Sequence, residues 1–299
     1  METMTEPALD LMDIRSETGE LVMRFSPQHG GTATSLQFQG QELLYTRPSF
    51  GKTHKLDLDG GFPFLFPVCG RLERGGKLGR YSYHHSYYDL PIHGFAPYLA
   101  WDVINRDAHQ LELQLTHSEK TLPHYPFHFT VCLDYQLTGR ELICKQTVIN
   151  CDTKPMPYSC GFHPYFRVED KARTLLKYDV VKCFAYNERL TDVIGEKPCF
   201  NLPTPLNNPA LNEQLTMIGP NKKVQLQFPD GLVLILEAQG LEEANMFPYI
   251  QLYHRADEPF FCVEPWMSVP NALNTVSGMR WLLPGQTEHA VIRLSIQKS

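Results

Sequence analysis

Glu264 has the most unusual surroundings of any charged side chain in the sequence. It follows the apolar run 260–263 and precedes Pro265 and Trp266. A carboxylate among Phe, Val and Trp side chains is expected to lose part of its hydration, which raises its pKa and makes it a stronger base. The alternative is a glutamate at a strand end that turns its side chain outward to water.

Two histidines stand where the neighbouring residues restrict the backbone. His163 lies between a Phe and a Pro and follows Gly161, while His93 comes two residues after Pro91 and directly before Gly94. An imidazole in an aromatic pocket is a natural proton donor, and the glycine before His163 suggests a close backbone approach. The alternative for each is a core histidine bonded to backbone. No H-E-x-x-H motif occurs, and the sequence predicts no metal site.

Arg71 follows Gly70 and an apolar run, so its guanidinium is expected to point inward. A buried guanidinium needs an anion or several acceptors. The alternative is a salt bridge with Glu73 or Asp89. Further basic residues make the stretch 71–80 locally positive, which predicts either a small anion-binding patch or a solvated loop: these are Arg74, Lys77 and Arg80.

Aromatic side chains close to these polar residues could bind a sugar. Flat aromatic faces stack on the C–H side of a pyranose, while Arg, His, Asn and Glu side chains bond its hydroxyls. The combination favours a neutral polyhydroxyl ligand, and the candidate faces are Phe62, Phe162, Tyr165 and Trp266.

Strands must position these side chains, because the dominant hydrophobic period is two. Alternation marks the ranges 21–25, 111–116, 127–138 and 292–296, and a Pro-Asp-Gly turn at 229–231 joins two strands of a hairpin. Another turn is expected at Gly139-Arg140, and helical patterns are scarce. The sequence therefore predicts one large antiparallel β domain over residues 1–299, a sandwich or barrel, with a long irregular connection at 187–222.

Composition is ordinary for a globular protein and excludes several classes. The 299 residues are 42% hydrophobic and 20% charged, with a net charge of −6. A basic face for nucleic acid is not expected, no apolar run could span a bilayer, and the first residues do not resemble a signal peptide. These features predict a cytoplasmic protein without nucleic-acid or membrane partners.

Eight cysteines are present, and none forms a C-x-x-C pair. Most lie in apolar, strand-like contexts. We therefore expect reduced cysteines that act as small core residues.

Five segments, taken in order, resemble the aldose 1-epimerases, or galactose mutarotases, and their relatives that act on hexose 6-phosphates. The segments are GGFPFLFPVCGRL (60–72), LPIHGFAPYLAWDV (90–103), PHYPFHFTVCLDYQL (123–137), GFHPYF (161–166) and CVEPWMSVPNALNT (262–275). Each segment is modest alone, but the ordered set is specific and covers most of the chain.

The resemblance implies an all-β, galactose mutarotase-like fold, a large antiparallel β-supersandwich. It implies interconversion of the α and β anomers of an aldose without metal or organic cofactor, by a monomer or weak homodimer. By position, His163 matches the family's general acid, Glu264 its general base, and Arg71 and His93 its sugar-binding residues. The residues themselves add Trp266 as a stacking face and Arg74 as a donor to an anionic group.

The residue types suit that reaction independently. Mutarotation removes a proton from the C1 hydroxyl and delivers one to the ring oxygen, which a carboxylate of raised pKa and an ordinary imidazole can do. This requires His163 and Glu264 to meet across a gap wide enough for a pyranose.

One family feature is unmatched. Galactose mutarotases carry an Asp that binds sugar hydroxyls. In this sequence Asp192 lies in the corresponding region of the chain, but no motif surrounds it. The substrate is therefore left open between an aldose and an aldose phosphate, and a hexose-6-phosphate 1-epimerase is one alternative function. A non-catalytic sugar-binding protein on the same scaffold is the other.

Overall fold

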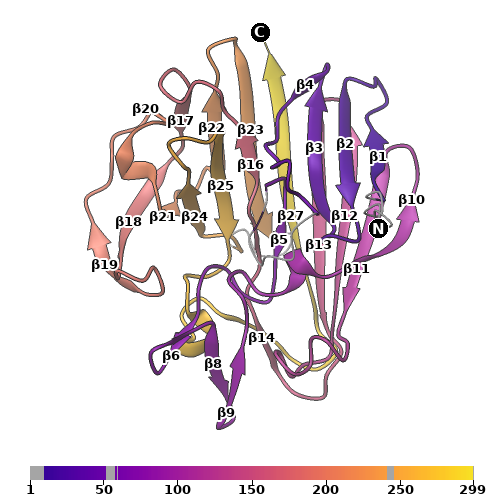
Figure 1. Cartoon of the computed structure of the whole chain (residues 1–299), viewed down its shortest axis with the longest axis vertical. Coiled ribbons are helices and arrows are strands. Elements are labelled where there is room, and N and C mark those ends of the chain that lie inside the picture. The colour runs from indigo at the N-terminus through magenta and orange to yellow at the C-terminus, as the bar shows by residue number, and fades with distance from the viewer. Residues whose placement is uncertain (1–9, 52–57, 59, 241–245, 299) are drawn as a thin grey trace, which may run out of the picture.

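The computed structural model describes residues 10–51, 58, 60–240 and 246–298, and most of them lie in or between antiparallel strands (Figure 1). The largest sheet has nine strands, in the order β10 (Asp102–Arg106), β11 (Gln110–Thr116), β12 (Phe129–Thr138), β13 (Glu141–Asn150), β27 (Thr287–Lys298), β23 (Leu232–Gly240), β22 (Lys223–Gln227), β17 (Leu175–Lys177) and β20 (Thr204–Pro205).

A second sheet carries most of the candidate site. Its order is β19 (Val193–Lys197), β18 (Val180–Tyr186), β21 (Gln214–Ile218), β24 (Tyr249–Tyr253), β25 (Phe260–Trp266), β15 (Gly161–Phe162) and β5 (Phe64–Leu65), and β16 (Tyr165–Arg167) also pairs with β25.

The remaining elements are shorter. A four-stranded sheet contains β1 (Met12–Arg15), β2 (Leu21–Ser26), β3 (Thr32–Phe38) and β4 (Gln41–Glu42). Three strand pairs join β6 (Glu73–Arg74) to β7 (Lys77–Leu78), β8 (Arg80–Tyr83) to β9 (Ser86–Asp89), and β14 (Met156–Tyr158) to β26 (Arg280–Leu282). The described helices are single turns: η1 (Ala96–Tyr98), η2 (Pro209–Leu211) and α1 (Ala272–Thr275).

The sheets form two layers around one main core. In Figure 1 the four-stranded sheet lies beside the β16–β25 region, in front of the long strands of the nine-stranded sheet. Apolar side chains from both layers meet between them, as where Phe25 of β2 contacts Tyr135 of β12 with ring centroids 4.8 Å apart. The all-β sandwich that the resemblance implied is therefore confirmed.

Alternation located most of the strands correctly. The expected strands at 21–25, 111–116, 127–138 and 292–296 correspond to β2, β11, β12 and part of β27, and the Pro-Asp-Gly turn joins β22 to β23. Gly139 has φ +57° in the turn between β12 and β13, a conformation that glycine adopts readily.

The expectation of an irregular connection at 187–222 was wrong. This range contains β19, β20 and β21, and β21 is an inner strand of the second sheet. Four of the five β21 residues are buried, so its side chains do not alternate between apolar and polar and the period of two is lost.

The expectation that all cysteines are reduced was also wrong. Cys183 of β18 and Cys199, which follows β19, form a disulfide with Cα atoms 5.2 Å apart. Strand pairing aligns Cys183 with Lys197, and this brings Cys199 within reach. The other six cysteines are free, and four of them are buried as expected.

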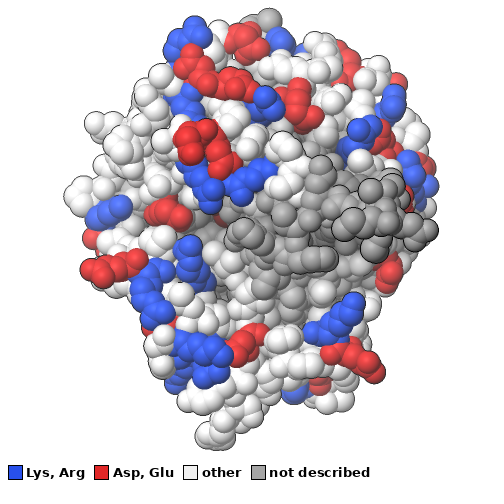
Figure 2. Space-filling model, viewed as in Figure 1, with Lys and Arg blue, Asp and Glu red and all other residues white. Residues whose placement is uncertain are grey.

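On the face shown in Figure 2, Lys and Arg side chains are interspersed with Asp and Glu. No helix among the described residues is long and apolar enough to cross a bilayer.

Candidate active site

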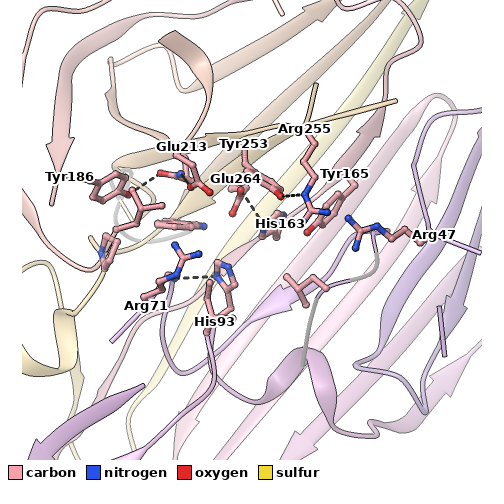
Figure 3. A pocket seen from close by; sticks show the side chains of 17 residues that line it. Arg47, Arg71, His93, His163, Tyr165, Tyr186, Glu213, Tyr253, Arg255 and Glu264 are labelled. Atoms are coloured by element: carbon pink, nitrogen blue, oxygen red, sulfur yellow. Dashed lines mark hydrogen bonds and ion pairs between the residues drawn. The ribbon is translucent and has the colours of Figure 1, made fainter. Parts of the chain in front are cut away.

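A cavity of about 160 Å³ opens over β24 and β25 and contains most of the predicted site residues (Figure 3). Its charged and amide-bearing lining residues are Arg47, Arg71, His93, His163, Glu213, Gln251, Arg255 and Glu264. Its aromatic lining residues are Tyr165, Tyr186, Tyr253 and Trp266.

Strand register brings His163 opposite Glu264. On one side of β25, β15 pairs Gly161 with Trp266 and β16 pairs Tyr165 with Cys262. His163 lies midway between these pairs, just as Glu264 lies midway between Trp266 and Cys262. Directly opposed residues share one face of an antiparallel sheet, so the two side chains form a cross-strand pair.

The two reactive groups touch rather than leave a gap between them. His163 Nε2 and Glu264 Oε1 are 3.3 Å apart, and the side chains are 6% and 1% exposed. The expected sugar-wide separation is therefore wrong, and a sugar bound in this cavity would lie over the pair instead. This spacing still suits an anomeric centre, because O1 and the ring oxygen O5 are bonded to the same carbon and lie close together.

Burial disfavours charge on both members of the pair. Burial raises the pKa of Glu264 well above its ordinary value, and the nearby Glu213 carboxylate raises it further. Burial lowers the pKa of His163 to about 3, contrary to the expectation of an ordinary imidazole. The pair therefore holds one proton between its two groups over a wide pH range.

Backbone and ring contacts hold His163 in place. Its N–H donates to the Pro63 carbonyl oxygen (2.9 Å), and its ring stacks on Tyr165 with centroids 4.6 Å apart and planes 7° apart. A Cβ on Gly161 would lie 2.6 Å from the Pro265 carbonyl oxygen, so the close approach predicted before His163 is confirmed.

The backbone around His93 is restricted, and a hydrogen bond favours one tautomer of its ring. Its φ is +65°, and a Cβ on the following Gly94 would lie 2.1 Å from the Phe66 carbonyl oxygen. The Gly70 N–H donates to His93 Nδ1 (3.1 Å), so a neutral His93 ring carries its proton on Nε2. His93 therefore offers the cavity a donor.

That tautomer bears on metal binding. His93, His163 and Glu264 each have a possible ligand atom, and these atoms lie within 4.8 Å of one another. A neutral imidazole has one lone pair for a metal, and in His93 that lone pair accepts the Gly70 N–H. The cluster fits proton transfer better than coordination by all three residues.

Arg71 lines the cavity, whereas the rest of the basic stretch does not. The two proposed ion-pair partners are engaged elsewhere, since Glu73 pairs with Arg189 and Asp89 with Lys77 and Arg80. Arg74, which the sequence suggested as a donor to an anionic group, is not among the residues that line the cavity. It is exposed in the β6–β7 hairpin, which turns at Gly75 and Gly76.

Two of the four predicted aromatic faces line the cavity. Trp266 packs edge-on against His93 with centroids 5.8 Å apart, and Tyr165 lies beside His163. Phe62 and Phe162 are fully buried in the main core instead. Phe162 precedes His163 in the chain and therefore points to the other face of the sheet.

Sequence reasoning missed a carboxylate on the left of the cavity in Figure 3. Glu213 lies next to β21 and accepts a hydrogen bond from Gln251 Nε2 (3.2 Å), and Gln251 Oε1 accepts one from Tyr186 Oη (2.9 Å). Asp192 is not among the cavity-lining residues, and it accepts a hydrogen bond from Asn271 Nδ2 instead. No motif surrounds Glu213, so only strand pairing could have located it.

Arg47 and Arg255 were also missed, because each lies in a connection without a distinctive pattern. They line the opposite end of the cavity, on the side of His163 and Tyr165 (Figure 3).

Comparisons with known proteins agree with the fold. The Slr1438 protein from Synechocystis sp. PCC 6803 superposes with a TM-score of 0.84 at 26% identity, over 100% of both chains. A galactose mutarotase related enzyme from Lactobacillus acidophilus gives 0.78 at 20% identity, over 96% of this chain and 98% of that one. A galactose 1-epimerase from Lactobacillus acidophilus NCFM gives 0.75 at 14% identity, over 98% and 100%.

Sequence similarity to curated relatives is more limited. The plasmid-encoded protein LacX of Lactococcus lactis subsp. lactis is 27% identical over 110 residues, which cover 36% of this chain and 37% of LacX. The family model described as aldose 1-epimerase, in contrast, matches residues 14–295. Because that match spans nearly the whole chain, this protein belongs to the aldose 1-epimerase family.

Proposed function

We propose that this protein is an aldose 1-epimerase in which Glu264 and His163 exchange protons with the anomeric centre of a hexose. The observation that carries the proposal is the 3.3 Å contact between a buried carboxyl group and a buried imidazole at the base of a cavity lined with polar and aromatic side chains. Family membership supports the same reaction.

With one proton between its two groups, the pair can supply both the base and the acid that ring opening needs. When the proton is on His163, the pair is a carboxylate base next to an imidazolium acid. Glu264 then takes the proton of the O1 hydroxyl while His163 delivers its proton to O5 and the C1–O5 bond breaks. The products are an open-chain aldehyde, a neutral carboxyl group and a neutral imidazole.

Ring closure reverses these transfers. Rotation about the C1–C2 bond presents the other face of the aldehyde, the O5 hydroxyl returns its proton to His163, and Glu264 returns its proton to O1. Glu264 Oε2 has no hydrogen-bond partner among the described residues, so it can accept the O1 proton while Oε1 remains near His163. The pair ends in its starting state, and no covalent intermediate forms.

Surrounding residues would orient the sugar. His93 Nε2–H and Arg71 supply donors to the sugar hydroxyls, and Glu213 supplies an acceptor. Trp266 offers a stacking face for the ring.

Polarimetry of freshly dissolved α-glucose and α-galactose tests the proposal. Glu264→Gln keeps the shape of the side chain but cannot act as a base, so we expect kcat to fall by about 10²–10⁴-fold. Equal rates for the wild type and the variant would remove Glu264 from the mechanism.

A non-catalytic sugar-binding protein would not need this acid–base pair. Calorimetric binding of a hexose, with anomerisation no faster than in buffer, would favour that alternative.

A further inference from the structure

Two neighbouring side chains of the cavity each bury a polar atom that has no hydrogen-bond partner among the described residues. These atoms are Trp266 Nε1 and Glu264 Oε2, in residues that are only 3% and 1% exposed. An indole nitrogen can only donate a hydrogen bond, and an ionised carboxylate oxygen can only accept one. Buried indole N–H groups usually have a partner, so an unpaired donor next to an unpaired acceptor indicates that a ligand supplies both bonds.

Strand geometry places these two atoms on the same side of β25. Glu264 and Trp266 are two residues apart in that strand, so their side chains point to the same face. Burial and the Glu213 carboxylate raise the pKa of Glu264, whereas the indole N–H acts in the opposite direction and must therefore lie near the carboxyl group. The two atoms are neighbours that do not satisfy each other.

Packing fixes the direction of the indole N–H before any ligand arrives. A Cβ on Gly161 would lie 2.9 Å from Trp266 Cδ1, the carbon bonded to Nε1, and a Cβ on Gly70 would lie 3.3 Å from Cη2 at the far end of the ring. The ring also packs against His93. A donor that is fixed in advance needs little reorganisation when it binds.

One hydroxyl group could satisfy both unpaired atoms. A hydroxyl can donate to Glu264 Oε2 and accept from the Trp266 N–H at the same time. The proposed mechanism, on which this inference rests, identifies that hydroxyl. Oε1 lies near His163, so Oε2 takes the proton of O1, and O1 would lie between Oε2 and the indole.

We infer that Trp266 is a further catalytic residue, whose indole N–H donates a hydrogen bond to O1 of the sugar. When Glu264 takes the O1 proton, the electrons of that O–H bond form the C1–O1 double bond. The electrons of the C1–O5 bond move to O5, which takes the His163 proton. O1 carries negative charge while its proton leaves ahead of C1–O5 cleavage, and a fixed donor stabilises that charge more than it stabilises the hydroxyl. This role uses the edge of the indole rather than its stacking face.

The indole N–H signals in an NMR spectrum test the contact in the unaltered protein. The chain has three tryptophans, so nitrogen-15 labelling of their side chains gives three signals, which Trp281→Phe and Trp101→Phe assign. Two of them are internal controls outside the cavity lining. Trp101 Nε1 donates to the Ala96 carbonyl oxygen (3.0 Å), and Trp281 is 46% exposed.

The probes are glucose and galactose, together with their 1,5-anhydro counterparts, which keep the ring and lack O1. We expect the hexoses to move the Trp266 indole proton downfield, because a hydrogen bond deshields it. The anhydro sugars should leave it near its free position at concentrations where saturation-transfer NMR shows that they are bound. The signals of Trp101 and Trp281 should not move.

Trp266→Phe separates donation from stacking, since it keeps an aromatic face and loses the N–H. We expect kcat to fall by roughly threefold to tenfold, the range for one neutral hydrogen bond. The affinity ratio of hexose to anhydro sugar should fall by a similar factor, which a packing defect alone would not cause. Trp281→Phe is the matched control and should change neither quantity.

A Trp266 signal that bound hexoses leave in place, or that both kinds of sugar move equally, would overturn the contact. Because the spectrum uses the unaltered protein, this holds even if Trp266→Phe does not fold. Movement by hexoses alone, without faster anomerisation in polarimetry, would disprove the function and retain the contact. Faster anomerisation without that movement would do the opposite.

Discussion

A single proton shared by Glu264 and His163 is the central feature at the scale of residues. The same burial raises the pKa of the Glu264 carboxyl group and lowers the pKa of the His163 imidazole, so neither group favours its charged form in the absence of substrate. A sugar hydroxyl and ring oxygen would supply hydrogen-bond partners to the pair and make its charged tautomer accessible. The protonation states then belong to the pair rather than to either residue.

The pH dependence of kcat/KM should reflect this coupling. The one-proton form extends from the His163 pKa, about 3, up to the raised pKa of Glu264. Activity should therefore stay high through neutral pH and fall on the alkaline side, where the pair loses its proton. Polarimetry corrected for the spontaneous rate measures the profile. A narrow maximum between the ordinary values of 4.5 and 6.5 would contradict the shared proton.

Glu264 should also destabilise the folded protein. Its folded pKa lies above its unfolded value, so unfolding releases a proton and the free energy of unfolding decreases as pH rises above about 4.5. Glu264→Gln should be neutral near pH 4 and stabilising by on the order of 1 kcal/mol at pH 8.

Denaturant unfolding at the two pH values measures that difference. Glu258→Gln is the control, and it should change stability in the opposite direction. Burial alone would raise the pKa of Glu258, but hydrogen bonds from Arg47 and Tyr45 hold that pKa below its ordinary value. Its removal should cost stability above pH 4.5. A Glu264→Gln variant less stable than the wild type at pH 8 would contradict the burial argument.

At the scale of elements, β25 organises the site because it pairs on both sides. β15 and β16 set His163 against Glu264, and β24 sets Gln251 against it from the other side. Side chains alternate along β25, so Val263 enters the main core while Glu264 and Trp266 face the cavity. A shift of one residue would move all of these side chains to the wrong face.

Gly161→Ala tests how closely β15 must approach β25. The added Cβ would lie 2.6 Å from the Pro265 carbonyl oxygen, so the strands must separate. We expect a loss of about 1–3 kcal/mol in stability and of about tenfold or more in kcat, since small displacements of a catalytic group are costly. Gly139→Ala is the control, because it strains a left-handed turn with nothing within 4 Å of its Cβ and should leave kcat unchanged. An unchanged kcat in Gly161→Ala would show that the pair tolerates strand movement.

At the scale of the whole molecule, the site depends on two layers packed on one core. The nine-stranded sheet contributes little to the cavity lining, but its apolar face supports the layer that carries the cavity. The candidate active site and the packing surface therefore lie on opposite faces of the second sheet.

Phe25→Ala tests this separation. Phe25 is fully buried against Tyr135 between the layers, so we expect a loss of about 3–5 kcal/mol in stability. The variant should retain normal kcat at temperatures where it is folded, as measured by thermal unfolding and polarimetry. Tyr87→Ala, at a side chain 64% exposed, should change neither quantity. A large loss of kcat in folded Phe25→Ala would show that packing and chemistry are coupled.

The sequence by itself determined the strand periodicity, most hairpins, the family and the residues that meet at the base of the cavity. These features depend on local patterns: alternation reflects one buried face, and the apolar flanks of Glu264 already indicate its desolvation. Tertiary structure alone decided that β21 lies inside a sheet, that Arg74 lies outside the cavity, and that Glu213, Arg47 and Arg255 line it. Their neighbours in the chain carry no signal, because their roles come from strand register and from contacts between segments far apart in sequence.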